Sequence, residues 1–236
     1  MKKLLVMLTG LVLSAAIHAQ QVNDPNAEVR EAKNYHGINV SSSFNVYISQ
    51  SNEEAVAVSA SETKYRERIK TEVRDGILYI RYDNEGKWNS GNKRLKAYIS
   101  VKTIDRLTVS GACDVFISGT LQSDALTIHQ SGASDLKGKI DVKKLMVDIS
   151  GASDITVTGT ATQVDVEASG ASDFKGFDLV TDYCDARASG ASDIRITVNK
   201  ELSASASGAS DVHYKGEAKV RDLKTSGASS VNRSRS

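Results

Sequence analysis

The sequence predicts an all-β fold, a right-handed parallel β-helix, and the main observation behind this prediction is a repeated pentapeptide. Seven copies or near-copies of Ser-Gly-Ala-Ser-Asp occur, and they begin at Ser110, Ser131, Ser150, Ser169, Ser189, Ser207 and Ser226. Successive copies start 21, 19, 19, 20, 18 and 19 residues apart. A period near 19 is typical of a solenoid, in which each repeat is one coil stacked on the last.

Residues on both sides of each pentapeptide alternate between apolar and polar, as in strands with one buried face. The positions three before and five after the first serine are apolar in every copy. The positions two before and six after it are polar, with Phe116 as the exception. A coil of this length traces roughly 60 Å of extended chain, too much for a simple hairpin. Because parallel crossovers are overwhelmingly right-handed, we expect a right-handed coil.

The pentapeptide is expected to form a corner between two strands. Glycine supplies the backbone freedom of a sharp corner, and we expect the small alanine to fit inside it. Serine and aspartate side chains are expected to accept hydrogen bonds from nearby backbone N–H groups and so hold the turn. The interior is expected to narrow toward the C-terminus, where the smaller residues are Ala186, Ala188, Ala204 and Ala206.

The aspartates of the repeat are expected to stack in a ladder about 5 Å apart. This turn ladder comprises Asp114, Asp135, Asp154, Asp173, Asp193 and Asp211. Like charges at that spacing repel by roughly 3 kcal/mol per neighbouring pair at an effective dielectric near 20. We interpret these carboxylates as structural groups that accept backbone hydrogen bonds, with cation binding as the alternative. The sequence therefore predicts no cofactor and no metal site, since the glycine-rich nonapeptide of calcium-binding β-rolls is absent.

The chain divides into three parts. Lys2 and Lys3, an apolar run after them and a small residue at its end predict a secretory signal over residues 1–19. Residues 20–34 are polar and are expected to be a flexible leader, and residues 35–236 a single β-helix domain. We therefore expect an exported protein, in the periplasm or at the cell surface, with no membrane span once the signal is cleaved.

The first third of the domain, residues 35–105, is expected to be a less regular β section before the coils of 106–236. Within it Val40–Val46 aligns position for position with Val109–Val115, as a degenerate eighth copy. A hairpin is expected around Asp75-Gly76. The expected strands are 55–59, 69–73, 77–82 and 95–101, with a loop over 83–92.

The charged residues and the histidines do not indicate a nucleic-acid-binding or metal-binding site. The 30 basic and 29 acidic residues form no basic patch, so we expect no nucleic acid partner. The histidines His36, His129 and His213 lie far apart, and a shared metal site is not expected. Tyr82, Trp88 and Tyr98 are a candidate sugar-stacking patch. Such residues also cover sheet ends or fill loops, and both interpretations stay open.

The two cysteines are expected to be free thiols. Cys113 and Cys184 fall about four coils apart, roughly 19 Å along the axis, whereas a disulfide needs Cα atoms within about 7 Å. Cys184 occupies a position that is apolar in other copies and is expected to be buried. Cys113 replaces the second serine of the first corner and is expected to lie near the surface and to be the more reactive thiol.

Gly37-Ile38-Asn39, the irregular β section and the serial pentapeptide together resemble one known family. It is the "putative auto-transporter adhesin, head GIN domain" family of the Bacteroidetes, and the resemblance runs from Tyr35 to the end of the chain. The resemblance implies a β-helix, a role in adhesion at the cell surface or envelope, and no assigned active site.

We therefore expect an exported, non-catalytic scaffold that binds a surface glycan or an extracellular protein. A carbohydrate-active enzyme, similar to polysaccharide lyases and hydrolases, is one alternative, and acidic side chains gathered in one cleft would favour it. A structural envelope protein that self-assembles is another. A coil end that pairs with a second chain would favour that alternative, because open β edges are prone to association.

Overall fold

The computed structural model describes residues 24–84 and 92–234. The expected signal over 1–19 and Trp88 lie outside the described residues. The strands form one 16-stranded sheet that winds into a β-solenoid of about 7 turns with coils of about 19 residues, which confirms the predicted fold class. No helix in the described ranges is long and apolar enough to cross a membrane.

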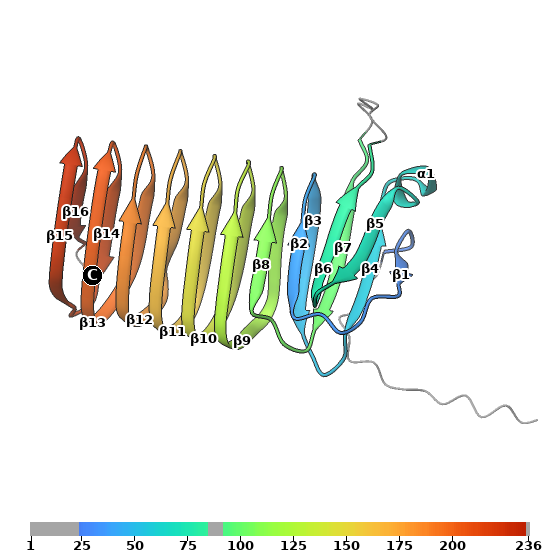
Figure 1. The fold of residues 1–236 in the computed structure, drawn as a ribbon, viewed down its shortest axis with the longest axis horizontal. Helices are drawn as coiled ribbons and strands as arrows, with labels where there is room; N and C mark the ends of the chain where they lie inside the picture. The colour runs from blue at the N-terminus through green and yellow to red at the C-terminus, as the bar shows by residue number, and fades with distance from the viewer. Residues whose placement is uncertain (1–23, 85–91, 235–236) are drawn as a thin grey trace, which may run out of the picture.

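The regular coils are parallel strands stacked in sequence order (Figure 1). Each of the long strands β9 to β13 bends around one coil, and successive aspartates of the repeat are paired in register. The strands are β8 (Arg106–Val109), β9 (Asp114–Gln130), β10 (Asp135–Ile149), β11 (Asp154–Ala168), β12 (Asp173–Ala188), β13 (Asp193–Gly208), β14 (Asp211–Lys215), β15 (Lys219–Gly227) and β16 (Ser230–Arg233).

The residues predicted from the alternation to face inward are buried in every coil except the last. The apolar residues three before and five after the first serine are buried from Leu107 to Val212. The four alanines of the C-terminal coils are buried, so they lie at inward positions as expected. In the last copy Leu223 is 48% exposed and Val231 half-buried, since no described strand lies beyond them.

The corner differs from the expectation in which side chain faces inward. The glycines do adopt the left-handed backbone, with φ between 79° and 91°. The alanines, however, are exposed, and the second serines are fully buried in every copy from Ser134 to Ser210. The reason is that the alternation continues through the corner, so the residue two before each buried apolar position also points inward. In the corner of β13, for example, the Ser192 hydroxyl donates to the carbonyls of Ser189 at 2.9 Å and Ala168 at 3.0 Å.

The degenerate eighth copy forms the coil next to β8 and β9. Strand β2 (Gly37–Val40) pairs in parallel with β8, and β3 (Phe44–Gln50) pairs in parallel with β9. Ser42 takes the place of the corner glycine with φ 98°. Phe44 takes the place of the second serine and is fully buried, so the predicted alignment is confirmed.

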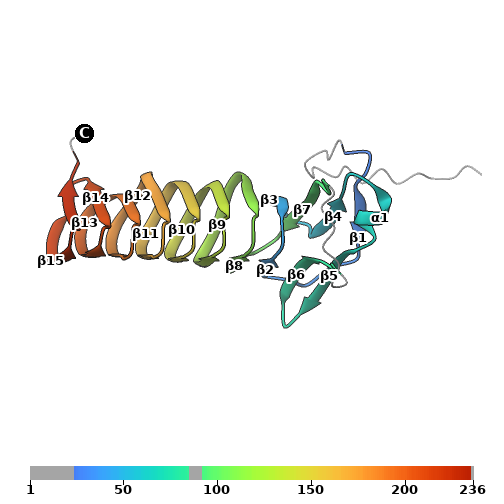
Figure 2. The same ribbon diagram turned by 90° about the horizontal axis from the view of Figure 1, so that it is seen from above.

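The rest of the N-terminal section does not follow chain order. Strands β6 (Ile77–Tyr82) and β7 (Leu95–Val101) pair with β2 and β3 on the side away from β8 and β9. Viewed from above, the remaining elements lie at this end of the solenoid (Figure 2). They are β1 (Glu28–Arg30), β4 (Ala55–Ser59), α1 (Thr63–Arg66) and β5 (Ile69–Arg74).

The predicted hairpin is present in this end of the fold, whereas the predicted leader is not wholly separate from it. Asp75 and Gly76 join β5 and β6 as a two-residue hairpin with φ 50° and 73°, the backbone of a type I′ turn. The expected flexible leader is part of the fold from residue 24 onward, because β1 pairs antiparallel with β4 and Ala32 is buried. The short helix α1 was not expected from the sequence.

Candidate binding surface

An apolar row crosses five neighbouring strands on the outer face of the N-terminal half. The paired residues that form it are Val29, Ala57, Tyr98, Tyr47 and Phe116, on β1, β4, β7, β3 and β9. Their neighbours along β3, β4 and β7 face the core, so alternation turns these side chains outward. Val29 is 79% exposed and Phe116 36% exposed. We call this set the apolar row.

The three aromatic rings of the apolar row stack on one another. The ring centroids of Tyr47 and Tyr98 are 5.2 Å apart with planes at 14°, and those of Tyr47 and Phe116 are 5.5 Å apart with planes at 20°. Both faces of the Tyr47 ring are therefore covered. A stack of this kind presents ring edges to the solvent, and it forms an apolar ridge rather than a flat platform of open ring faces.

Polar side chains border the ridge on both sides. One step along the strands lie the paired serines Ser49, Ser100 and Ser118, and on the other side lie Lys96, Asn45 and Asp114. An apolar centre with a polar border is the usual anatomy of a protein interface.

Asp24 fixes the Tyr98 end of the ridge. The Tyr98 hydroxyl donates to Asp24 Oδ2 at 2.9 Å, and Lys96 Nζ lies 3.1 Å from the same oxygen. Burial raises the pKa of Asp24, but the hydrogen bonds from Lys96 and Tyr98 outweigh it and bring the pKa to about 2. The carboxylate is thus charged at neutral pH and holds the tyrosine ring in place.

Of the predicted aromatic patch, only Tyr98 lies in the apolar row. Tyr82 is 7% exposed, and its ring contacts the cationic groups of Lys93 at 5.0 Å and Arg68 at 5.4 Å. Tyr82 therefore offers little ring surface to a ligand. The sequence does indicate the other two aromatic members of the row. Phe116 breaks the polar pattern of its repeat position, and Tyr47 occupies the same position in the degenerate copy.

The six aspartates of the turn ladder lie side by side on β9 to β14, but most do not cap the backbone as expected. Asp154 and Asp173 contact Lys175 Nζ at 2.5 Å and 3.3 Å, and Asp193 contacts Arg195 at 2.8 Å. Lys175 and Arg195, each two residues beyond a corner aspartate, thus offset the like charges of Asp154, Asp173 and Asp193. Asp211 is different, because it accepts hydrogen bonds from the Ser230 N–H and hydroxyl. Across the described residues, no three His, Cys, Asp or Glu side chains gather closely enough to hold a metal ion.

Both cysteines are free thiols in the structure, and strands β10 and β11 lie between them. Cys184 is buried as expected. Cys113 is fully buried too, contrary to the expectation of a surface thiol, because its position in the corner faces inward. Its Sγ contacts the Ser110 carbonyl at 3.4 Å, as the serines of later coils do. Burial raises the pKa of both thiols, which makes them poor nucleophiles.

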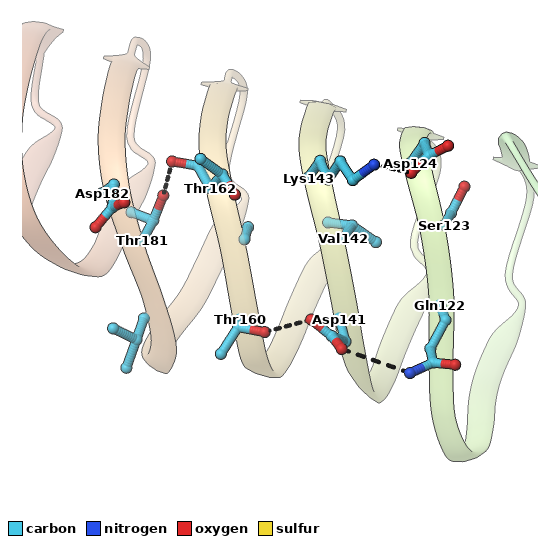
Figure 3. A pocket seen from close by; sticks show the side chains of 12 residues that line it. Gln122, Ser123, Asp124, Asp141, Val142, Lys143, Thr160, Thr162, Thr181 and Asp182 are labelled. Carbon is cyan, nitrogen blue, oxygen red and sulfur yellow. Dashed lines mark hydrogen bonds and ion pairs between the residues drawn. The ribbon is translucent and has the colours of Figure 1, made fainter.

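A second surface feature is an open groove over the bends of β9 to β12, with a volume of about 630 Å³. Figure 3 shows Asp141 between Gln122 and Thr160, whose hydroxyl donates to it at 2.6 Å. Asp124 pairs with Lys143 at 2.7 Å, and Asp182 at the far side pairs with Lys200 at 2.8 Å. Three carboxylates therefore line one groove, but each already has a donor.

Comparison with known proteins identifies the fold and the family. A family model described as "Putative auto-transporter adhesin, head GIN domain" matches residues 34–218. No curated protein matches the chain. A putative adhesin from Bacteroides fragilis has a similar structure, with TM-score 0.83 and 22% identity over 88% of this chain and 96% of that one.

Two further solved structures share the fold. A putative adhesin from Parabacteroides merdae has TM-score 0.71 and 16% identity over 89% of this chain and 95% of that one. A putative lipid binding protein from Parabacteroides distasonis has TM-score 0.67 and 22% identity over 90% and 98%. At these identities the likeness concerns the fold alone, whereas the family model covers most of the chain. The chain therefore belongs to the "putative auto-transporter adhesin, head GIN domain" family.

Proposed function

We propose that this protein is an exported, non-catalytic binding scaffold of the cell envelope, and that the apolar row contacts an extracellular protein. The signal expected over residues 1–19 supports export. The apolar row itself is the observation that carries the proposal. An aromatic ridge on a stacked parallel sheet is held rigid before binding, so little side-chain freedom is lost when a partner docks.

The ring geometry favours a protein over a glycan as the partner. Sugar rings bind aromatic residues by stacking on an open ring face, and the central Tyr47 has both faces occupied. Tyrosine and phenylalanine edges beside serine hydroxyls and Lys96 instead resemble the centre and rim of a protein interface. The exposed Val29 extends the row beyond Tyr98 and Ala57, at the end opposite Phe116.

The groove with three carboxylates is the observation that favours a carbohydrate-active enzyme, and its chemistry supports that function poorly. A general acid needs a carboxyl that is shielded from water and proton-bearing at working pH. The Asp124 side chain is 84% exposed and paired with Lys143. Asp141 accepts hydrogen bonds from Thr160 at 2.6 Å and from Gln122 at 3.5 Å, so both of its carboxylate oxygens already have a partner. If the groove were catalytic, Asp141→Asn would abolish polysaccharide turnover measured by release of reducing ends.

The proposal is tested by binding of the purified chain from residue 20 to immobilised fibronectin, laminin, collagen and fibrinogen and to a glycan array. We expect binding to a protein, and we expect the double variant Tyr47→Ser/Phe116→Ser to weaken it by about 30-fold, the cost of losing a central hot spot of roughly 2 kcal/mol.

The matched control is Tyr183→Ser, which removes a tyrosine that is 41% exposed on β12, far along the solenoid from the apolar row. Tyr183→Ser should leave the affinity unchanged. Equal affinity of the double variant and the wild type, or binding to glycans alone, would refute the assignment of the apolar row.

A further inference from the structure

Among the described residues, the outer edges of β15 and β16 pair with no other strand, and the interior behind β15 is uncovered. Strand β15 pairs with β13 along one edge, and within the described ranges no strand pairs with its other edge. Leu223 takes the inward position that Ala204 has one coil earlier, yet Leu223 is 48% exposed and Ala204 4%. The opposite end of the solenoid is covered by β1, β4, α1 and β5 (Figures 1 and 2).

The sequence of β15 is complementary to itself in antiparallel pairing. When two copies pair with Leu223 opposite Leu223, Asp222 of each copy lies opposite Lys224 of the other. Asp222 and Lys224 point outward, where they form a 2.8 Å ion pair within the copy. Opposite charges directly across an antiparallel pair are stabilising, and like charges are destabilising.

Neighbouring registers lack this match. The inward and outward faces of the two strands agree only when the register shifts by an even number of residues. Centring the pair on Asp222 would set two aspartates opposite each other, and centring it on Lys224 would set two lysines opposite each other. A shift in the β13 pairing next to Arg221 marks a bulge, which confines regular pairing to the residues around Leu223.

We propose that two copies of this chain associate through the outer edge of β15, antiparallel and related by a two-fold axis at Leu223. Backbone hydrogen bonds across the edge, the Leu223 pair and two reciprocal Asp222–Lys224 pairs hold the contact. Such an interface is isologous and closes at a dimer. Because the other end of each solenoid is covered, the contact does not propagate into a fibre.

The dimer places the two apolar rows at its far ends, since each row crosses the N-terminal strands (Figure 1). Two binding faces on one rigid body raise the apparent affinity for a surface that carries many copies of a partner. The proposed dimer depends on the β15 edge alone and is independent of the function proposed for the apolar row.

The test is the molar mass of the chain from residue 20, measured by light scattering and analytical ultracentrifugation over a wide range of concentration. We expect a dimer. Asp222→Lys should weaken it by about tenfold or more, because two like-charge pairs replace two opposite-charge pairs. The double variant Asp222→Lys/Lys224→Asp should restore the dimer, because the reciprocal pairs form again with their signs exchanged.

The control is Glu167→Lys, a charge reversal in the outward row of Lys224, three coils inside the solenoid. Glu167→Lys should remain dimeric, and circular dichroism should show an unchanged fold for every variant. A monomer at all concentrations, open-ended filaments, or an Asp222→Lys dimer of unchanged affinity would overturn the proposal. A variant Leu223→Ser that dimerises like the wild type would overturn it as well.

Discussion

The inward-facing serine of the corner is the feature whose stability contribution can be worked out most directly. In Ser192→Ala the side chain loses its hydroxyl in a site that is fully buried. That hydroxyl donates toward the Ser189 and Ala168 carbonyls and accepts from the Ser189 N–H at 3.2 Å. The substitution therefore removes the polar link between one corner and the coil before it.

The expected loss is about 1 kcal/mol rather than 3, because the groups that remain are mostly still paired. The Ser189 N–H keeps its bond to the Ala168 carbonyl at 2.9 Å, so no donor is orphaned. The Ala168 carbonyl loses the hydroxyl but keeps the Ser189 N–H as a donor. The Ser189 carbonyl loses the hydroxyl as its hydrogen-bond donor. For a domain of this size, a loss of 1 kcal/mol lowers the melting temperature by about 2–4 °C.

Ser189→Ala is the matched control, the same chemical change three residues away in the same corner. The Ser189 hydroxyl is half-exposed and makes no hydrogen bond with any described residue, so this variant should stay within about 0.5 kcal/mol of the wild type. Chemical denaturation of both variants decides the matter. Equal losses, or a larger loss for Ser189→Ala, would refute the assignment of the second serine to the interior.

Three further predictions follow from burial and charge. Ile155→Asp should prevent folding or cost several kcal/mol, because it buries a charge, whereas Thr156→Asp on the outer face should be nearly neutral in a thermal melt. Asp154→Ala should lower the free energy of unfolding by less than about 1 kcal/mol, as expected for the loss of a partly exposed ion pair with Lys175. If micromolar calcium raised the melting temperature of the wild type by many degrees, the ion-pair interpretation would be contradicted. Asp24 has a pKa of about 2 in the folded chain against 3.8 ordinarily, so its charged form stabilises the fold at neutral pH, and this stabilisation is lost as the pH falls from 3.8 through about 2. The difference in unfolding free energy between the wild type and Asp24→Asn should shrink over the same pH range.

The regular coils could be predicted because their sequence states the same alternation seven times. A single strand of alternating residues is ambiguous, but Leu136, Ile155 and Phe174 stand at one repeat position and are paired across β10, β11 and β12. The mistaken placement of alanine came from treating the corner as a break in that alternation. Counting inward positions from Ile194 back to Ser192 gives the correct face, and it also predicts the burial of Cys113.

The N-terminal end could not be predicted in the same way. Strands β6 and β7 lie outside β2 and β3 although they follow them in the chain. No repeated pentapeptide marks these short strands, and the sequence between β6 and β7 contains no copy of it. Pairing between strands without a shared motif depends on three-dimensional packing, which periodicity alone does not contain.

The apolar row is a departure from the repeat rather than an addition to it. Its aromatic members occupy one outward position, which on β9 lies two residues beyond the corner Asp114. Along the solenoid the same position holds Lys137, Thr156, Lys175, Arg195 and His213. In the later coils Lys175 and Arg195 at this position neutralise the aspartate ladder. On β7, β3 and β9 the same position carries Tyr98, Tyr47 and Phe116. Phe116 therefore puts no cation beside Asp114 at this position, and on β7 and β3 the aspartate is itself replaced by Lys96 and Asn45. Where a repeat departs from its own pattern, a functional reason is expected, and this departure supports the proposal that the binding surface lies on the N-terminal coils.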